Sequence, residues 1–207
     1  MRFHYRVSWI LLNAVERAVF GLKVTGKELV PRSGAVIIAS NHLSYSDPPV
    51  VGSAVPREVY FLAKEELFGN PAFGWLIRNY NAIALRRAVG DIGAVKRAVE
   101  LLKQGKAILM FPEGTRSLGG RLLRPKAGLG LIACMAGAAV VPAYVTGTNK
   151  LGRVLLRRAK LAVSFGEPVE AAEFGDGAGG SHERYQKLTD EVMRRIEDLA
   201  QKAGAAS

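Results

Sequence analysis

The sequence is poor in the side chains from which proteins build disulfides and metal sites. Its 207 residues contain one cysteine, Cys134, and three histidines. A single cysteine forms no internal disulfide, and no cluster of histidine or cysteine suggests a metal site or a metal cofactor. Cys134 lies in the small, apolar run LIACMAGAAV, so we assign it to the core rather than to catalysis.

A long uninterrupted apolar run is also missing. The stretch from Val7 to Val15 is largely apolar, but Glu16 and Arg17 end it well short of the ~20 residues that a membrane-spanning helix needs. Basic residues precede this run, as in a secretory signal, yet no small-residue cleavage site follows it cleanly. We therefore expect neither a spanning helix nor a signal peptide here.

The N-terminal segment instead suits a helix that lies in the membrane interface. Its large apolar side chains are flanked by cations, the arrangement that such helices use against anionic headgroups. The apolar residues include Phe3, Trp9, Ile10, Leu12, Val19 and Phe20, and the basic ones are Arg2, Arg6, Arg17 and Lys23. The alternative is a helix packed on the core. We divide the chain into an interface helix over residues 1–22 and one domain over residues 23–207.

Acidic residues are scarce relative to basic ones. Lys and Arg number 29 against 18 Asp and Glu, which gives a net charge of +11 and a surface that attracts anions. The partners open to such a surface are nucleic acid, anionic lipid headgroups and anionic substrates. No RNA-recognition or helix-turn-helix signature occurs, so we expect no nucleic-acid partner.

Short apolar runs alternate with helical patterns through the rest of the chain. One helix pattern spans residues 91–104 and another spans 185–199, while the Gly-rich segment 174–181 is predicted to be a loop. The expected buried strands are Val36–Ala39, Val59–Ala63, Ala82–Leu85, Ala107–Phe111, Val140–Val145 and Leu161–Phe165. This alternation predicts an α/β fold with a mixed, largely parallel sheet flanked by helices.

The segment NHLSYSDP, residues 41–48, follows the first of these strands and places a histidine and an aspartate five residues apart. Asp47 followed by Pro48 is typical of a helix start. Asp47 would accept a hydrogen bond from one ring nitrogen of His42, which leaves the other nitrogen to take a proton from a hydroxyl. The alternative is a capping aspartate beside an unrelated loop histidine.

Two further strand ends carry charged groups. The turn FPEGTRS, residues 111–117, can present backbone N–H groups and the Arg116 guanidinium to a phosphate, and Arg86 and Arg87 follow the strand that ends at Leu85. Because ligands bind at the carboxyl ends of strands in open α/β sheets, we expect these segments to share one edge with His42. No Gly-x-Ser-x-Gly elbow occurs, so a serine-hydrolase mechanism is not expected.

Together these segments resemble the glycerolipid acyltransferase family, typified by 1-acylglycerol-3-phosphate acyltransferase. NHLSYSD matches the family's Asn-His-x-x-x-x-Asp block, and FPEGTRS matches its Phe-Pro-Glu-Gly-Thr-Arg-Ser block residue for residue. Lys126-x-Gly128 resembles the family's Lys-x-Gly, and Val141-Pro142-Ala143, continuing to Gly147, resembles its fourth block. The resemblance covers residues 34–147 in the family's order.

The family's second block fits less well. Its usual form is Gly-x-Ile-x-Ile-x-Arg, whereas this chain has NAIALRR over residues 81–87. Asn81 replaces the glycine, Arg86 stands where an acid often does, and Arg87 matches the arginine. The resemblance associates this block with the phosphate of the acceptor, so the additional charge leaves the acceptor headgroup open.

The resemblance implies acyl transfer from acyl-coenzyme A or acyl-carrier protein to a lysophospholipid hydroxyl, without a cofactor; the first expectation is 1-acylglycerol-3-phosphate. By resemblance, His42 is the general base and Asp47 orients it. Backbone N–H groups around Gly114 would stabilise the oxyanion. Arg87 and Arg116 would hold the phosphate. Glu113 would contact the glycerol or orient Arg116. The other expected substrate-binding residues are Asn41, Ser44, Arg86, Thr115 and Lys126.

Two other functions stay open. One is acylation of another acceptor, such as a lyso-ornithine lipid, and the other is a catalytically silent basic module that docks on anionic membranes. The presence of both His42 and Asp47 in their block argues against the silent module. A lipid acceptor and a cytosolic thioester place the expected protein on the cytoplasmic face of the cell membrane, bound to its anionic surface without crossing it.

Overall fold

The sheet at the centre of the molecule is mixed and largely parallel, as predicted. A computed structural model describes residues 2–85, 92–174 and 181–205, and in these residues seven strands form one sheet in the order β1-β7-β6-β2-β5-β3-β4. Only β6 and β7 pair antiparallel, so β1 and β7 run opposite to the other five. The strands are β1 Lys23–Thr25, β2 Val36–Ser40, β3 Val59–Lys64, β4 Ala82–Leu85, β5 Ala107–Met110, β6 Ala139–Thr146 and β7 Ala162–Phe165.

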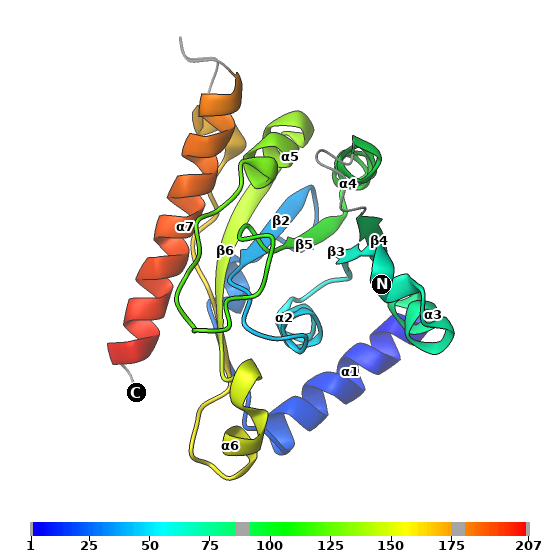
Figure 1. Ribbon diagram of the computed structural model, residues 1–207, viewed down its shortest axis with the longest axis vertical. Helices are drawn as coiled ribbons and strands as arrows, with labels where there is room; N and C mark the ends of the chain where they lie inside the picture. The colour runs from blue at the N-terminus through cyan, green and yellow to red at the C-terminus, as the bar shows by residue number, and fades with distance from the viewer. Residues whose placement is uncertain (1, 86–91, 175–180, 206–207) are drawn as a thin grey trace.

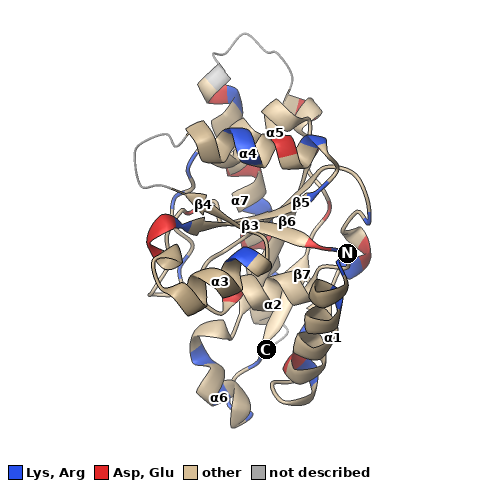
Figure 2. Ribbon diagram, turned by 90° about the vertical axis from the view of Figure 1, so that its right-hand side faces the viewer, with Lys and Arg blue, Asp and Glu red and all other residues tan. Residues whose placement is uncertain are grey.

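Helices cover both faces of the sheet. Figure 2 shows α4, α5 and α7 on one side and α1, α2, α3 and α6 on the other. The helices are α1 Phe3–Ala18, α2 Asp47–Ala54, α3 Pro71–Asn79, α4 Ile92–Lys103, α5 Gly128–Ala136, α6 Leu151–Leu155 and α7 Ser181–Ala205, with 3₁₀ turns η1 Lys27–Leu29, η2 Glu65–Phe68, η3 Thr148–Lys150 and η4 Ala171–Phe174. Among the described residues, no helix is long and apolar enough to cross a bilayer.

Strand β2 shows why the expected strands read as continuous apolar runs. All five of its residues are buried, and successive side chains point to opposite faces. Ile37 and Ala39 belong to the core under α4, α5 and α7, whereas Val36 and Ile38 belong to the core that includes α2. A parallel strand covered on both faces therefore needs apolar residues at every position.

The six predicted strands all form, with ends that differ by at most one residue. Strand β1 was not predicted because its three residues carry too little pattern, and it exists by pairing with β7. The expected helix over 185–199 lies inside α7, and the one over 91–104 corresponds to α4 with Asp91 outside the described residues. The loop expected over 174–181 also falls largely outside them, at 175–180.

Helix α1 attaches to the domain through a polar face. Trp9 Nε1 donates to the Val55 carbonyl at 3.1 Å, Asn13 Nδ2 donates to the Ser53 carbonyl at 3.0 Å, and the Tyr5 hydroxyl accepts from Val59 N–H at 3.3 Å. These bonds fix α1 against α2 and the start of β3. The expectation that Trp9 faces lipid is therefore wrong.

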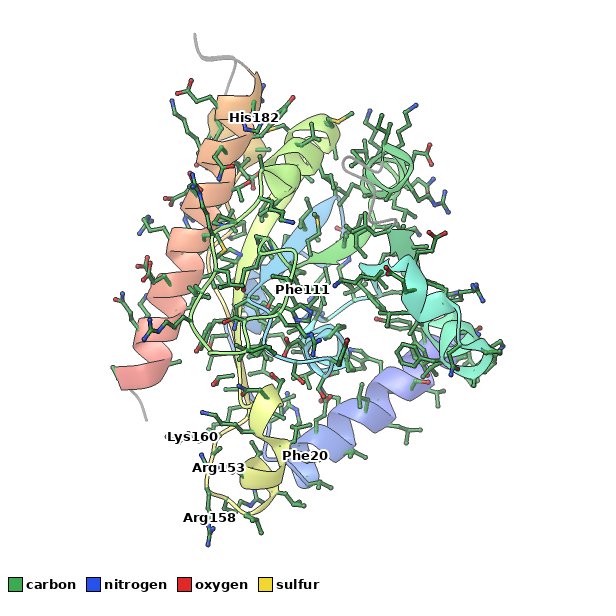
Figure 3. All side chains as sticks on the ribbon, in the orientation of Figure 1. Phe20, Phe111, Arg153, Arg158, Lys160 and His182 are labelled. Atoms are coloured by element: carbon green, nitrogen blue, oxygen red, sulfur yellow. The ribbon has the colours of Figure 1, made fainter. Side chains whose placement is uncertain are left out.

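The outward face of α1 is apolar. Its exposed large apolar residues are Phe3, Val7, Ile10, Leu11, Leu12 and Val15, with Val19 just beyond the helix. Phe20, which we also expected on the lipid side, packs against the core that contains α2 (Figure 3). The helix thus packs on the domain, as the alternative interpretation expected, and it leaves a set of apolar side chains uncovered.

Glu16 is the one carboxyl group of α1, and it faces inward. It is 4% exposed and hydrogen-bonded to the Ser53 hydroxyl. That hydroxyl also lies 3.0 Å from the Val50 carbonyl and has a single proton to donate. A protonated Glu16 resolves this by donating to Ser53. Burial accordingly raises the pKa of Glu16 from 4.5 to about 7.

We predict that Glu16 makes the protein less stable as pH rises from about 4.5 to 7. In this window the folded chain keeps a proton that the unfolded chain has lost, so the free energy of unfolding falls with increasing pH. Between the two ends of the window, the free energy of unfolding should fall by about 3 kcal/mol because of Glu16. Urea unfolding of wild type and Glu16→Gln at both ends of the window measures it. The variant should gain relative stability at high pH. Glu28→Gln, at an exposed carboxyl, controls for charge, and a pH-independent difference contradicts the assignment.

Candidate active site

A histidine and a buried aspartate meet at the carboxyl end of β2. His42 Nδ1 lies 2.7 Å from Asp47 Oδ2, and Asp47 is completely buried, whereas the His42 side chain keeps 17% of its surface exposed. With Nδ1 held by the carboxylate, Nε2 is the nitrogen that can take a proton from a hydroxyl. The predicted contact between His42 and Asp47 is confirmed.

The loop before α2 is folded around the same carboxylate oxygen. Asp47 Oδ2 accepts from Leu43 N–H at 2.6 Å and from Ser44 N–H at 2.8 Å. Asp47 is the first residue of α2 and Ser46 precedes the helix, so the predicted start is correct to within one residue. We expected Asp47 to cap the start of the helix, but its carboxylate makes no capping bond. It bonds instead to the preceding loop and holds that loop in place.

Glu113 supports the histidine from the neighbouring strand. Its Oε1 accepts from His42 N–H at 3.0 Å and its Oε2 from Leu123 N–H at 2.9 Å, and it is 2% exposed. Burial raises the pKa of this carboxyl, against the effect of these N–H donors. The two roles expected for Glu113, contact with glycerol and orientation of Arg116, do not match this geometry. Glu113 instead ties the loops after β2 and β5 together.

The turn after β5 completes the surroundings of the imidazole. Ser117 N–H donates to the His42 carbonyl at 2.7 Å, and the Phe111 ring stacks on the His42 ring with centroids 4.0 Å apart. Figure 3 shows Phe111 in the middle of the molecule. The sequence placed Phe111 at a strand end and in the FPEGTRS block but gave no sign of this contact, because a stacking contact between two loops leaves no local pattern.

Gly114 adopts a left-handed conformation, with φ of 67°, at the tip of this turn. Its N–H donates to the Phe111 carbonyl at 3.0 Å, so this N–H is already used within the turn. The Lys126 side chain lies over Gly114, because a β-carbon there would sit 3.3 Å from Lys126 Nζ. Thr115 is exposed beside them. Gly114, Thr115 and Lys126, which the resemblance names as substrate-binding residues, are therefore close to one another.

Arg116 is held by an aromatic side chain. Its guanidinium carbon lies 3.7 Å from the centroid of the Tyr45 ring, which is itself 66% exposed. This cation–π contact joins the loop after β2 to the turn after β5 and leaves the guanidinium at the surface of the site. Tyr45 occupies one of the variable positions of the His-x-x-x-x-Asp block, so the motif alone gave no reason to select it.

Asn41 is structural rather than exposed to substrate. It is 1% exposed, its Nδ2 donates to the Val145 carbonyl at 3.0 Å, and its Oδ1 accepts from Val145 N–H at 2.7 Å. These bonds connect the end of β2 to β6. Ser44 is half-buried, and its hydroxyl accepts from Ser46 N–H at 3.2 Å. Asn41 and Ser44 thus maintain the loop that carries His42.

The second block begins with Asn81 in a left-handed conformation, with φ of 68°. Asparagine tolerates this region better than other residues that have a side chain, which accounts for its place at a glycine position. The side chain accepts a hydrogen bond from Arg2 and donates to Glu58 Oε1 at 3.0 Å. Arg86 and Arg87 lie outside the described residues.

The chain is similar in sequence to known acyltransferases. Residues 21–146 match the family model described as Acyltransferase. The chain is 32% identical over 183 residues to the 1-acyl-sn-glycerol-3-phosphate acyltransferase of Bacillus subtilis, covering 88% of this chain and 89% of that protein. It is 33% identical over 139 residues to the lyso-ornithine lipid O-acyltransferase of Pseudomonas aeruginosa, covering 67% of this chain and 52% of that protein.

A solved structure shares the fold. The crystal structure of the 1-acyl-sn-glycerophosphate acyltransferase PlsC from Thermotoga maritima aligns with a TM-score of 0.72 at 31% identity, covering 97% of this chain and 84% of that one. The match extends beyond the sheet to nearly the whole chain. The motifs, the His42–Asp47 contact and these similarities agree, and the chain belongs to the Acyltransferase family.

Proposed function

We propose that this protein transfers a fatty acyl group from acyl-coenzyme A or acyl-carrier protein to the hydroxyl of 1-acylglycerol-3-phosphate, forming phosphatidic acid. The observation that carries the proposal is the His42–Asp47 pair at the carboxyl end of β2. The 32% identity to the Bacillus subtilis enzyme over most of both chains supports this acceptor.

His42 acts as the general base in this mechanism. Nε2 takes the hydroxyl proton as the acceptor oxygen attacks the thioester carbonyl, and Asp47 stabilises the imidazolium that results. The tetrahedral intermediate then collapses, the carbon–sulfur bond breaks, and the thiolate takes the proton back from His42. Because Gly114 N–H is used within its turn, we assign oxyanion stabilisation to the N–H groups of the following residues, Thr115 and Arg116.

The acceptor's phosphate requires cations at the mouth of the site. Arg116 is held there by Tyr45, and Lys126 lies beside Gly114. Arg87, which lies outside the described residues, is a third candidate ligand through its match to the family's second block. A guanidinium binds phosphate with two parallel hydrogen bonds, which makes Arg116 the principal ligand in this proposal.

A panel of acceptors with one acyl thioester tests the function. We expect 1-acylglycerol-3-phosphate to be acylated fastest. A lyso-ornithine lipid is the second candidate, favoured by the similarity to the Pseudomonas aeruginosa enzyme. If the lyso-ornithine lipid is acylated faster, it is the acceptor in place of 1-acylglycerol-3-phosphate. If no acceptor is acylated, the result supports a catalytically silent basic module.

We predict that His42→Ala lowers acyl transfer by at least ~10²-fold, because a general base contributes roughly 10²–10⁴-fold in rate. Steady-state kinetics with a soluble short-chain acceptor measures the effect. His182→Ala is the matched control, since His182 lies in the first turn of α7, far from Phe111 in Figure 3. Near wild-type turnover in a folded His42→Ala protein contradicts the role of His42.

We predict that Arg116→Ala raises the KM for a phosphate-bearing acceptor by about 10-fold or more, as expected for a lost hydrogen bond to a charged group, which is worth roughly 1.5–3 kcal/mol. The KM for the thioester should change little. Arg97→Ala, on the exposed face of α4, controls for the lost charge. A larger effect on the thioester shows that Arg116 binds a donor phosphate instead.

The proposal includes attachment to the cytoplasmic face of the membrane through α1. The exposed apolar stripe of α1 suits the acyl boundary, while Arg6 and Arg17 reach anionic headgroups. We propose residues 1–22 as this interface segment and residues 23–207 as the catalytic domain. Deleting the segment is a poor test, because Tyr5 and Glu16 are buried against the domain and their loss would expose the core.

We predict that Leu11→Ser, at a position that is 61% exposed, weakens binding to vesicles of phosphatidylglycerol and phosphatidylcholine by about 10-fold. Co-sedimentation at low and high salt measures the change, which should persist in high salt because apolar burial is not screened. Met135→Ser on α5 is the control, as an exposed apolar side chain on the opposite side of the sheet. If Leu11→Ser binds the vesicles as tightly as wild type does, α1 is not the segment that attaches the protein to the membrane.

A further inference from the structure

A second exposed apolar and basic segment follows β6. Residues 150–160 read KLGRVLLRRAK, with five cations and no carboxylate. Val154 is buried in the core, but Leu155 and Leu156 are 54% and 65% exposed. Arg153, Arg157 and Arg158 are exposed around them. Figure 3 shows Arg153 and Arg158 at the end of the molecule where α6 lies, near the end of α1. Two adjacent leucines exposed among arginines are unfavourable in water alone.

The backbone directly after these leucines is strained. Arg157 adopts a left-handed conformation with φ of 57°, which disfavours a residue with a β-carbon by roughly 1–2 kcal/mol. Its N–H bonds to the Val154 carbonyl at 2.9 Å, and Arg158 N–H bonds to the Arg153 carbonyl at 2.8 Å. This is the Schellman ending of a helix, in which glycine usually occupies the left-handed position. An arginine there adds a cation beside Leu156 where glycine would be less strained.

The sheet places this segment at the active-site edge. Strand β6 is parallel to β2 and adjacent to it, so η3 and α6 leave the same edge of the sheet as the His42 loop. The two bonds between Asn41 and Val145 fix this neighbourhood. Gly147 has φ of 88°, and a β-carbon there would lie 2.1 Å from the Lys160 carbonyl oxygen. The end of the segment at Lys160 therefore packs tightly against Gly147, shortly before its start.

The same segment adjoins α1. Lys23 N–H donates to the Leu161 carbonyl at 3.0 Å, and a β-carbon on Gly21 would lie 2.7 Å from Arg157 Nη1. Figures 1 and 2 both show α6 and the end of α1 at the same end of the molecule. The segment that carries Leu155 and Leu156 therefore lies next to the C-terminal end of α1.

We propose that residues 150–160 are a second membrane contact, in which Leu155 and Leu156 enter the acyl boundary while Arg153, Arg157 and Arg158 bind anionic headgroups. The partner is a bilayer surface rather than an acidic protein, because two exposed leucines lie among the arginines and the segment adjoins α1, which itself carries exposed apolar residues. Each basic residue near an anionic bilayer contributes about 1 kcal/mol, and apolar burial adds a part that salt does not screen. This contact deepens the proposed membrane function and brings the His42 edge of the sheet next to the lipid.

Vesicle co-sedimentation of two variants tests the proposal. Vesicles contain equal parts of phosphatidylglycerol and phosphatidylcholine, or phosphatidylcholine alone. Arg153→Gln/Arg157→Gln/Arg158→Gln should bind the anionic vesicles about 10²-fold more weakly. Leu155→Ser/Leu156→Ser should weaken binding to both kinds. The matched controls are Lys96→Gln/Arg97→Gln/Lys103→Gln on α4 for charge and Ile92→Ser/Met135→Ser for exposed apolar residues, and both should bind as wild type does.

Each other outcome overturns the proposal. Wild-type binding by both α6 variants shows that this segment does not touch lipid. If only the arginine variant loses vesicle binding, the leucines do not enter the bilayer. The surface is then purely electrostatic, as binding to an acidic protein would require. Activity on a soluble short-chain acceptor should be unchanged in every variant, so its absence in wild type counts against the proposed function and leaves the vesicle result to decide the contact.

Discussion

The site depends on one oxygen atom of a buried carboxylate. Asp47 Oδ2 is bonded to the His42 ring and to the N–H groups of Leu43 and Ser44. The atom that selects the tautomer of the base therefore also shapes the loop that carries it. A buried charge is costly unless it is paired and hydrogen-bonded, and this loop supplies those partners at Oδ2. Glu113, in the turn after β5, bonds to the backbone N–H of the same histidine, so two carboxylates from two separate segments fix the position of His42.

The sequence was sufficient to predict the parts of this architecture that depend on local pattern. Strands buried on both faces appear as continuous apolar runs, and a histidine and an aspartate five residues apart at a helix start are close enough for their side chains to meet. The edge shared by the loops after β2 and β5 follows from parallel pairing. These predictions need no knowledge of which distant residues touch.

Contacts between distant segments could not be predicted. Glu113 bonds to His42 and Leu123, Tyr45 stacks on Arg116, and β1 exists only through β7; in each case neither partner indicates the other in sequence. The sequence also did not reveal which side of α1 faces the domain. Its apolar residues indicated an amphipathic helix, but the choice of Trp9 as a lipid-facing residue failed because an indole N–H can satisfy a buried carbonyl.

The outward face of α1 also has a consequence for the protein away from membranes. In water this stripe is an uncovered apolar patch, and two molecules lower their free energy by placing such patches against each other. Self-association and membrane binding would then compete for the same surface by mass action. A concentrated, lipid-free preparation would hold part of the enzyme in a form that must dissociate before it reaches its substrate, so its specific activity would fall as protein concentration rises.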